Sequence, residues 1–334
     1  MRIAFELSGE HQTLPRSEVI GCLTSSNIPF REIATLDQVL IIETNEMPPI
    51  ARRLAMTHHI LEVIDVCQTD MELILTMVSA SDLPLGNEET FCVRAKKIKN
   101  YAFRGDIEKD VGAIIHKRGY KVGLEDPDVV FRLVITGDKC IFGRLLFSID
   151  RRQYEFRRPH LKPFFYPGAL LPGVARAIVN ISSVRPRELL LDPFCGTGGI
   201  LIEAGLMGVN CLGMDVQRKM VYGTAINFQH YDIGGELIIG DACNIGLADS
   251  SVDAIVTDIP YGKSTLYMAQ SLQDLYVKSL KEMYRVLKSG KNAVIVSQIP
   301  MKAIGEDVGF KVLEHHQQRV HKSLTRHIIV LKKR

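Results

Sequence analysis

The eight residues Asp-Pro-Phe-Cys-Gly-Thr-Gly-Gly at positions 192–199 constrain the fold of this chain more than any other segment. They join an apolar, strand-length run at 189–192 to a helical segment at 199–207. A glycine turn between a strand and a helix lets a ligand approach the backbone closely. Asp215 ends the next apolar run, where a carboxylate can accept hydrogen bonds from both hydroxyls of a ribose. This spacing predicts a ligand that contains a nucleoside, and leaves a nicotinamide dinucleotide and S-adenosylmethionine both open.

The rest of the C-terminal half repeats the alternation of strand and helix. Apolar strand-length runs stand at 189–192, 211–215, 237–240, 254–258 and 293–297, and helical patterns at 199–207, 218–231 and 272–287. Nearly continuous apolar strands that alternate with helices predict a doubly wound, mainly parallel sheet. The last two runs, 311–320 and 327–332, are predicted to pair as a hairpin at one edge.

The N-terminal half has a different pattern. Strands are predicted at 2–7 and 39–43 and helices at 16–25 and 49–66, which indicates a small α+β unit. A second set follows, with strands at 90–98, 129–136 and 139–147 and a helix at 106–118. The segment 150–172, rich in Arg, Pro and aromatic residues, is predicted to be a linker that packs against the protein.

Charge is unevenly distributed along the chain. Residues 1–93 hold 5 Lys+Arg against 14 Asp+Glu, whereas residues 94–158 hold 16 against 9. Dense basic residues favour a polyanionic partner such as a nucleic acid, although a solvated charged face has the same composition. The basic residues expected to meet phosphates are Arg94, Lys96, Lys97, Lys99, Arg104, Lys117, Arg118, Arg151, Arg152, Arg157 and Arg158.

Several features are missing from the sequence. No apolar run approaches the roughly 18 residues that a membrane span needs, and the N-terminus has no secretory signal pattern. The seven cysteines include no C-x-x-C pair, so we expect buried thiols in a reducing compartment. The histidine pairs lack further ligands at metal-binding spacing. The sequence predicts a cytoplasmic protein without a membrane contact and with no bound metal.

Two acidic residues help to choose between the nucleoside ligands. Asp192 directly precedes the glycine turn, where it can hold the ammonium group of a methionine moiety but would repel a pyrophosphate. Asp241 and Ala242 follow the third apolar run, at a place that suits contact with an adenine. The acid before the glycine turn favours S-adenosylmethionine over a dinucleotide. The adenine contact is consistent with this choice, and the motif that ends the fourth apolar run completes it.

The fourth apolar run ends in Asp258-Ile259-Pro260-Tyr261, which resembles the D/N-P-P-Y/F motif of amino-group methyltransferases. An exocyclic base amine attacks poorly because its lone pair is delocalised into the ring. Asp258 and the Pro260 carbonyl can accept the two amine protons and turn the lone pair toward a methyl group, while Tyr261 stacks on the base. Such a site requires a flipped-out base.

Over its full length the chain resembles the archaeal THUMP-domain tRNA guanine-N2-methyltransferases, above all those acting at guanosine 10. Besides the motifs above, the resemblance rests on residues 91–95, 126–130, 158–169 and 319–326. It implies a class I, Rossmann-like S-adenosylmethionine-dependent methyltransferase domain preceded by two others. The implied boundaries are a ferredoxin-like α+β domain at 1–66, a THUMP RNA-binding domain at 67–149, a linker at 150–172 and the methyltransferase domain at 173–334.

The resemblance also assigns residues. Asp258, Pro260 and Tyr261 are the expected catalytic group, although the family's usual motif has proline where this chain has Ile259. The segment 158–169 is expected to close over the methionine end of the cofactor, and the terminal loop to bring His321, Lys322 and Arg326 to the mouth of the site as RNA contacts. The expected cofactor-binding residues are Tyr166, Pro167, Gly168, Asp192, Pro193, Cys195, Gly196, Gly198, Asp215, Val216, Asp241 and Ala242.

The predicted reaction is transfer of a methyl group from S-adenosylmethionine to N2 of a tRNA guanosine at position 10, by a monomer. The same chemistry at tRNA guanosine 6, a ribosomal RNA guanine or a DNA base amine is the alternative within enzymes. A non-catalytic RNA-binding protein that retains the fold is the alternative from another class, and a dehydrogenase is a more distant one. The sequence leaves open the number of methyl groups added and the need for an activating protein.

Overall fold

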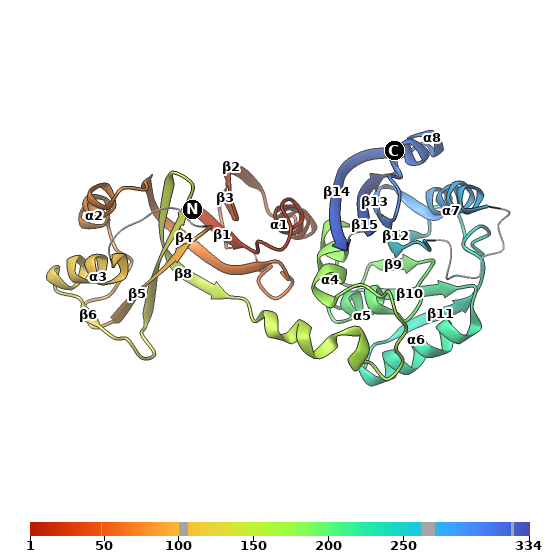
Figure 1. The fold of residues 1–334 in the computed structure, drawn as a ribbon, viewed down its shortest axis with the longest axis horizontal. Coiled ribbons are helices and arrows are strands. Elements are labelled where there is room, and N and C mark those ends of the chain that lie inside the picture. Colours follow the sequence, from red (N-terminus) through yellow and green to blue (C-terminus); the bar gives the residue numbers. More distant parts are fainter. Residues whose placement is uncertain (48, 100–105, 262–270, 322–323) are drawn as a thin grey trace. The chain divides into compact units, whose positions relative to one another are not determined.

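The computed structural model describes residues 1–47, 49–99, 106–261, 271–321 and 324–334 (Figure 1). Contacts between Cα atoms divide the chain into two compact units. The first comprises residues 1–12, 27–52 and 56–150, and the second comprises residues 13–26, 53–55 and 151–334. Within the described ranges, no helix is long and apolar enough to cross a membrane.

The first unit is built on an eight-stranded sheet in the order β2-β3-β1-β4-β8-β7-β5-β6. Its strands are β1 (Arg2–Leu7), β2 (Phe30–Leu36), β3 (Val39–Thr44), β4 (Thr57–Gln68), β5 (Thr90–Lys97), β6 (Lys121–Val122), β7 (Val129–Thr136) and β8 (Lys139–Ser148). Helices α2 (Met71–Ala80) and α3 (Ile107–Lys117) pack on it through a core that includes Phe91, Phe131 and Phe142. The Asp106 side chain caps α3 by accepting a hydrogen bond from Lys109 N at 3.2 Å, at the start of the predicted helix.

The helix predicted at 49–66 is wrong. Residues 57–68 form strand β4, which pairs on one side with β1 and on the other with β8. The segment contains Thr57, Ile60, Val63, Ile64 and Val66, β-branched residues that favour strands because their side chains are stiff at χ1. Because it pairs on both edges, this strand lies in the middle of the sheet. That position depends on residues far away in the sequence, so a local segment does not reveal it.

The second unit holds the predicted α/β half. Its strands are β9 (Leu189–Asp192), β10 (Asn210–Asp215), β11 (Gly235–Ile239), β12 (Val252–Asp258), β13 (Leu287–Ser297), β14 (Lys311–His321) and β15 (Leu324–Lys332). Their order is β11-β10-β9-β12-β13-β15-β14, with the first five parallel and the predicted β14–β15 hairpin antiparallel. The strand order reverses between β9 and β12, so the loops after these strands diverge and leave a crevice for a ligand.

Helices cover both faces of this sheet. They are α4 (Pro172–Ile181), α5 (Gly199–Gly205), α6 (Arg218–His230), α7 (Leu272–Val286) and α8 (Lys302–Val308). Figure 1 shows α5 and α6 on one side of the strands and α7 on the other. Residues 151–157 and 159–161 form two short 3-10 helices before α4.

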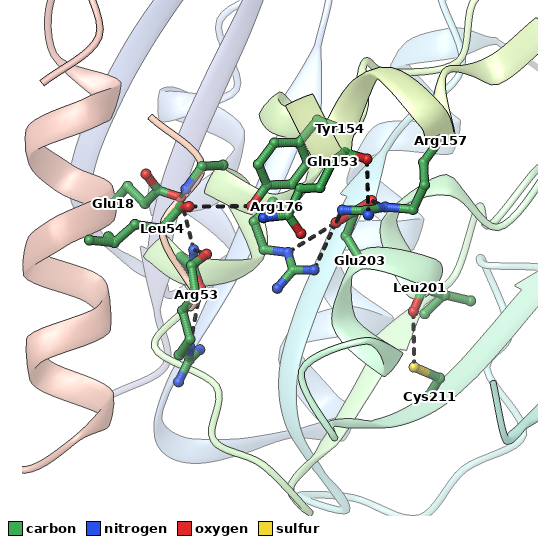
Figure 2. Close-up of polar contacts among 12 residues, drawn as sticks. Glu18, Arg53, Leu54, Gln153, Tyr154, Arg157, Arg176, Leu201, Glu203 and Cys211 are labelled. Carbon is green, nitrogen blue, oxygen red and sulfur yellow. Dashed lines mark hydrogen bonds and ion pairs between the residues drawn. The ribbon is translucent and has the colours of Figure 1, made fainter. Parts of the chain in front are cut away.

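Helix α1 (Leu14–Ser25) packs on the second unit although it lies near the N-terminus. The buried Glu18 Oε1 accepts hydrogen bonds from Ala55 N at 2.8 Å and Asn180 Nδ2 at 2.9 Å. Figure 2 shows Glu18 on α1 together with Arg53 and Leu54. Gly21 lies directly against α4, because a Cβ at this position would be 2.3 Å from the Asn180 carbonyl oxygen.

We expect Gly21→Ala to lower the free energy of unfolding by about 1–3 kcal/mol, since the added methyl collides with backbone that has no room to move. Gly173→Ala in α4 is the matched control, because no heavy atom lies within 4 Å of a Cβ there. That substitution should be neutral or stabilise by less than about 1 kcal/mol. Calorimetric unfolding of both variants checks the packing, and equal stability of the two would contradict it.

Candidate active site

A cavity of about 280 Å³ lies at the carboxyl ends of the parallel strands. Its walls come mainly from the loops after β9, β10, β11 and β12 and from residues 166–170, with Leu275 of α7 and Leu324 and Arg326 of β15 completing them. Every predicted cofactor-binding residue lines it except Gly198, and the three predicted catalytic residues Asp258, Pro260 and Tyr261 line it as well. Residues from four loops and the segment before α4 therefore share one site.

The loop after β9 is held by α6. Gly196 and Gly198 have φ values of +53° and +75°, in the left-handed region that favours glycine. Thr224 Oγ1 donates to the Gly196 carbonyl at 2.8 Å, and Asn227 Nδ2 donates to the Thr197 carbonyl at 2.9 Å. A Cβ on Gly198 would be 2.7 Å from Thr224 Cγ2, so this glycine serves the packing of the loop on α6.

Asp192 is buried at the start of this loop. Its Oδ1 accepts hydrogen bonds from Thr257 Oγ1 at 2.6 Å and Phe194 N at 3.2 Å. Burial raises the pKa of Asp192 to about 7, although the hydrogen bond from Thr257 opposes the shift. A cation beside this carboxylate would favour its ionised form, so the site suits a ligand that carries an ammonium group.

Asp215 ends β10 and joins the two neighbouring loops. Its Oδ2 accepts from Gly196 N at 3.0 Å and its Oδ1 from Gln217 N at 2.9 Å. Burial raises the pKa of this carboxyl, against the effect of both hydrogen bonds. Each carboxylate oxygen has a second lone pair, which leaves acceptors for a pair of vicinal hydroxyls.

Asp241 and Ala242 follow β11 at the same end of the sheet. Asp241 Oδ1 accepts from Cys243 N at 2.8 Å, which turns the loop, and Ala242 is buried against the cavity. Together with Ile200, Val216 and Met220, Ala242 gives the cavity an apolar wall that suits a flat aromatic ring, with Asp241 beside it as a hydrogen-bond acceptor.

Asp258 and Tyr261 contact each other at the end of β12. The Tyr261 hydroxyl donates to Asp258 Oδ1, and Arg326 Nε donates to the Tyr261 oxygen at 3.2 Å. Burial raises the pKa of Asp258 to about 6, while the Tyr261 hydrogen bond and the Arg326 charge lower it. Burial and the neighbouring carboxylate raise the pKa of Tyr261, so its hydroxyl stays protonated and acts as a donor.

The Pro260 carbonyl accepts a hydrogen bond from the Tyr276 hydroxyl at 2.9 Å. Tyr276 lies on α7 and is buried in the core beside Ile259. A carbonyl oxygen has two lone pairs, so Pro260 can accept a second donor. No local motif marks Tyr276, because only the packing of α7 brings it to this loop.

The structure gives a reason for the isoleucine within the motif. Ile259 N donates to the Val296 carbonyl at 3.0 Å and extends the pairing of β12 with β13 beyond Asp258. Proline has no backbone N–H and cannot form this bond. In this chain the hydrogen bond of strand pairing therefore fixes the backbone at Ile259. In the family's usual motif, the proline ring would fix the backbone at the same position.

The predicted RNA contacts fall into three groups. Arg94, Lys96, Lys97, Lys99, Lys117, Arg118, Arg152, Arg158 and His321 are exposed, and Arg151 is partly buried and donates to the Ala55 carbonyl. Arg157 and Arg326 are turned inward, Arg157 toward Glu203 and Arg326 into the cavity. Arg104 and Lys322 lie outside the described residues.

The Arg326 side chain therefore contacts other residues of the protein instead of lying exposed at the surface. In addition to its contact with Tyr261, its Nη2 donates to the Gly168 carbonyl at 3.1 Å. It connects β15, the end of the predicted catalytic motif and the segment before α4. Among the described residues, no group of three or more His, Cys, Asp or Glu side chains is arranged to hold a metal ion.

The strand order, the glycine loop after the first parallel strand and the carboxylates around one cavity define a class I S-adenosylmethionine-dependent methyltransferase. A family model described as "RMKL-like, methyltransferase domain" matches residues 159–328. The tRNA (guanine(10)-N2)-dimethyltransferase of Methanothermobacter thermautotrophicus is 38% identical over 100% of both chains. The chain belongs to the family of the tRNA (guanine(10)-N2)-dimethyltransferases.

A second relative agrees with this assignment, and a solved structure agrees with the fold. The tRNA (guanine(10)-N2)-dimethyltransferase of Pyrococcus abyssi is 34% identical and is matched over 89% of this chain and 90% of its own length. Among solved structures, TrmN from Thermus thermophilus has the same fold, with a TM-score of 0.56 at 20% identity over 100% of each chain.

Proposed function

We propose that this protein transfers methyl groups from S-adenosylmethionine to the exocyclic N2 of guanosine 10 in tRNA and forms N2-methyl- and N2,N2-dimethylguanosine. The observation that carries the proposal is one cavity that joins Asp192 and Asp215 to Asp258 and Pro260. The first pair suits the cofactor and the second pair suits an amine. Full-length relatives with this specificity support the choice of guanosine 10.

The cofactor supplies a methyl group on a sulfonium, and the protein prepares the nucleophile. Asp258 Oδ1 accepts the Tyr261 hydroxyl, and no described residue donates to Oδ2. We assign Oδ2 and the second lone pair of the Pro260 carbonyl to the two amine protons. This pairing aims the amine lone pair, and Asp258 takes up the proton that is released on transfer.

The first unit supports the RNA side of the proposal. Its basic residues at 94–99 and 117–118 are exposed and can neutralise phosphates. We propose that residues 67–149 are the THUMP RNA-binding domain, that residues 1–66 form the ferredoxin-like domain before it, and that 150–172 link them to a methyltransferase domain at 173–334. The proposed enzyme works as a monomer in the cytoplasm, with tRNA as its partner.

Transfer of labelled methyl groups to unmodified tRNA transcripts tests the function. We expect label in N2-methyl- and N2,N2-dimethylguanosine, and none when guanosine 10 is replaced. Label that survives this change but vanishes when guanosine 6 is replaced would move the target to position 6. Binding of S-adenosylhomocysteine without transfer to any RNA would favour the non-catalytic alternative.

The raised pKa of Asp258 predicts loss of activity in acid. The carboxylate must be ionised to accept the amine protons, so kcat at saturating cofactor should fall about tenfold per pH unit below a midpoint near pH 6. In Tyr261→Phe a hydrogen bond that lowers this pKa is absent, so the midpoint should move to higher pH. Profiles of kcat against pH for both proteins check this, and an unchanged midpoint would contradict the role of Asp258.

A further inference from the structure

Arg326 is a buried basic residue in the wall of the cavity. It is 8% exposed, and the other described charged side chains of the lining are Asp192, Asp215, Asp241 and Asp258. Among the described residues, its guanidinium group forms no ion pair with a carboxylate and donates to two neutral oxygens. A buried charge is normally paired with an opposite charge, and here hydrogen bonds take the place of the ion pair.

Two hydrogen bonds in series connect Arg326 to Asp258. Arg326 Nε donates to the Tyr261 oxygen at 3.2 Å, and the Tyr261 hydroxyl donates to Asp258 Oδ1. A guanidinium group has donors only, so the phenol oxygen must accept from it and the single phenol proton must point to Asp258. The arginine therefore fixes the direction of both bonds. A donor on the phenol oxygen also strengthens the phenol as a donor, because neighbouring hydrogen bonds polarise one another.

The sheet holds Arg326 at the edge where Asp258 lies. Asp258 of β12 pairs with Val296 of β13, which pairs with Ile328 of β15. Arg326 lies two positions before Ile328, toward the edge of the sheet that carries the cavity, and points to the same face. Its Nη2 donates to the Gly168 carbonyl at 3.1 Å, which gives the guanidinium group a second anchor. A side chain held by strand pairing and two hydrogen bonds is suited to position another group.

This arrangement leaves one oxygen of Asp258 for a substrate. Oδ1 accepts the Tyr261 hydroxyl, and no described residue donates to Oδ2. Without the arginine, the phenol proton is free to turn to another acceptor and the carboxylate is free to rotate. An amine that needs an acceptor at one fixed place then meets the carboxylate in several orientations, which lowers the rate of transfer.

Arg326 also acts on the ionisation of Asp258 through its charge. The titratable groups that face Asp258 are Tyr261 after the same strand, Arg326 from β15 and Asp192 from β9, while Tyr276 of α7 hydrogen-bonds the loop that follows. Burial raises the pKa of Asp258, whereas the Tyr261 hydrogen bond and the Arg326 charge lower it. Arg326 is the cation among these groups.

We propose that Arg326 is a positioning residue for methyl transfer, which holds Asp258 through Tyr261 so that one carboxylate oxygen faces the amine. The inference rests on the proposed function. In this assignment Arg326 acts on the protein and not on RNA, in contrast to the role that the sequence suggested for it.

Steady-state transfer of labelled methyl groups to tRNA, at saturating cofactor, tests this role in Arg326→Met. We expect kcat at a pH well above the midpoint to fall about 10- to 100-fold, the range for a misplaced reacting group. KM for tRNA should change by less than about threefold, because a contact inside the protein adds no affinity for the substrate. The midpoint of kcat against pH should move to higher pH, since the charge that lowers the pKa of Asp258 is absent.

Three further proteins separate the explanations. In a Tyr261→Phe background, Arg326→Met should lower kcat by less than about threefold more, because the hydroxyl through which it acts is already absent. Arg326→Lys keeps the charge, so its midpoint should stay near that of the wild type while kcat falls by less than about tenfold. This variant keeps the test available if Arg326→Met does not fold. Lys281→Met, at an exposed position of α7, is the control and should change neither kcat nor the midpoint.

The contrary outcomes are distinct. A rise in KM for tRNA with unchanged kcat in Arg326→Met would make Arg326 an RNA contact and overturn the inference. So would losses of kcat that multiply in the double variant, or a midpoint that moves as far in Arg326→Lys as in Arg326→Met. A wild type that transfers no methyl group to any RNA would instead overturn the proposed function itself.

Discussion

Asp258→Asn should lower kcat for methyl transfer to tRNA by roughly 10²- to 10⁴-fold, the range for loss of a positioned general base. Asparagine keeps the size of the side chain and one acceptor oxygen. It cannot take up the proton that the amine releases, and its amide can turn an NH₂ group toward the substrate. Single-turnover transfer of labelled methyl groups measures the loss directly.

The cofactor should still bind this variant. In the proposed mechanism Asp258 contacts the substrate amine and not the cofactor, so the dissociation constant of S-adenosylhomocysteine should change by less than about threefold. Asp249→Asn is the matched control, since the Asp249 side chain is 77% exposed and its contact with Arg285 is a surface ion pair. A variant Asp258→Asn that retains more than a tenth of wild-type kcat would remove Asp258 from the proposed mechanism.

Asp215→Asn should weaken S-adenosylhomocysteine binding by about 100-fold. Both carboxylate oxygens of Asp215 accept backbone N–H groups, from Gly196 and Gln217. An asparagine must place its NH₂ group against one of these donors, so the loop loses a hydrogen bond at the same time as the ribose loses an acceptor. Two such losses amount to about 3 kcal/mol. Titration calorimetry gives the affinity.

Asp241→Asn is the matched control for this effect. Asp241 lines the same cavity, but among the described residues only its Oδ1 accepts a backbone N–H, from Cys243. An asparagine keeps that bond with its carbonyl oxygen, so the expected loss is below tenfold. If both variants lost the same affinity for S-adenosylhomocysteine, the negative charge of the cavity would govern the affinity, and the hydrogen bonds that Asp215 accepts from the two loops would not.

Local signals in the sequence predicted the catalytic half well. The glycine turn at 192–199, the apolar strands and the D-x-P-Y motif are each contained within a few residues, and parallel strands bring their carboxyl ends to one edge of the sheet. Topology alone therefore collects Asp192, Asp215 and Asp258 around one cavity. The pairing of β14 with β15 also follows from two adjacent strand-length segments, 311–320 and 327–332.

Contacts between residues far apart in the sequence determined the structural features that the sequence did not predict. Residues 57–68 form a central strand because partners 50 or more positions away cover both edges. Helix α1 joins the second unit because Gly21 lets it approach α4 closely, and Glu18 finds Asn180 there. Neither contact leaves a pattern within one stretch of chain.

The basic residues show most clearly the difference between features that local sequence predicts and features that depend on tertiary packing. The sequence by itself determined the class of fold and located the glycine loop and the D-x-P-Y motif, because each depends on neighbours along the chain. It treated all arginines and lysines of the basic segments alike. Only the tertiary structure separated the exposed ones from Arg157 and Arg326. The physical reason is that burial and pairing decide the role of a charge, and both depend on residues far away in sequence.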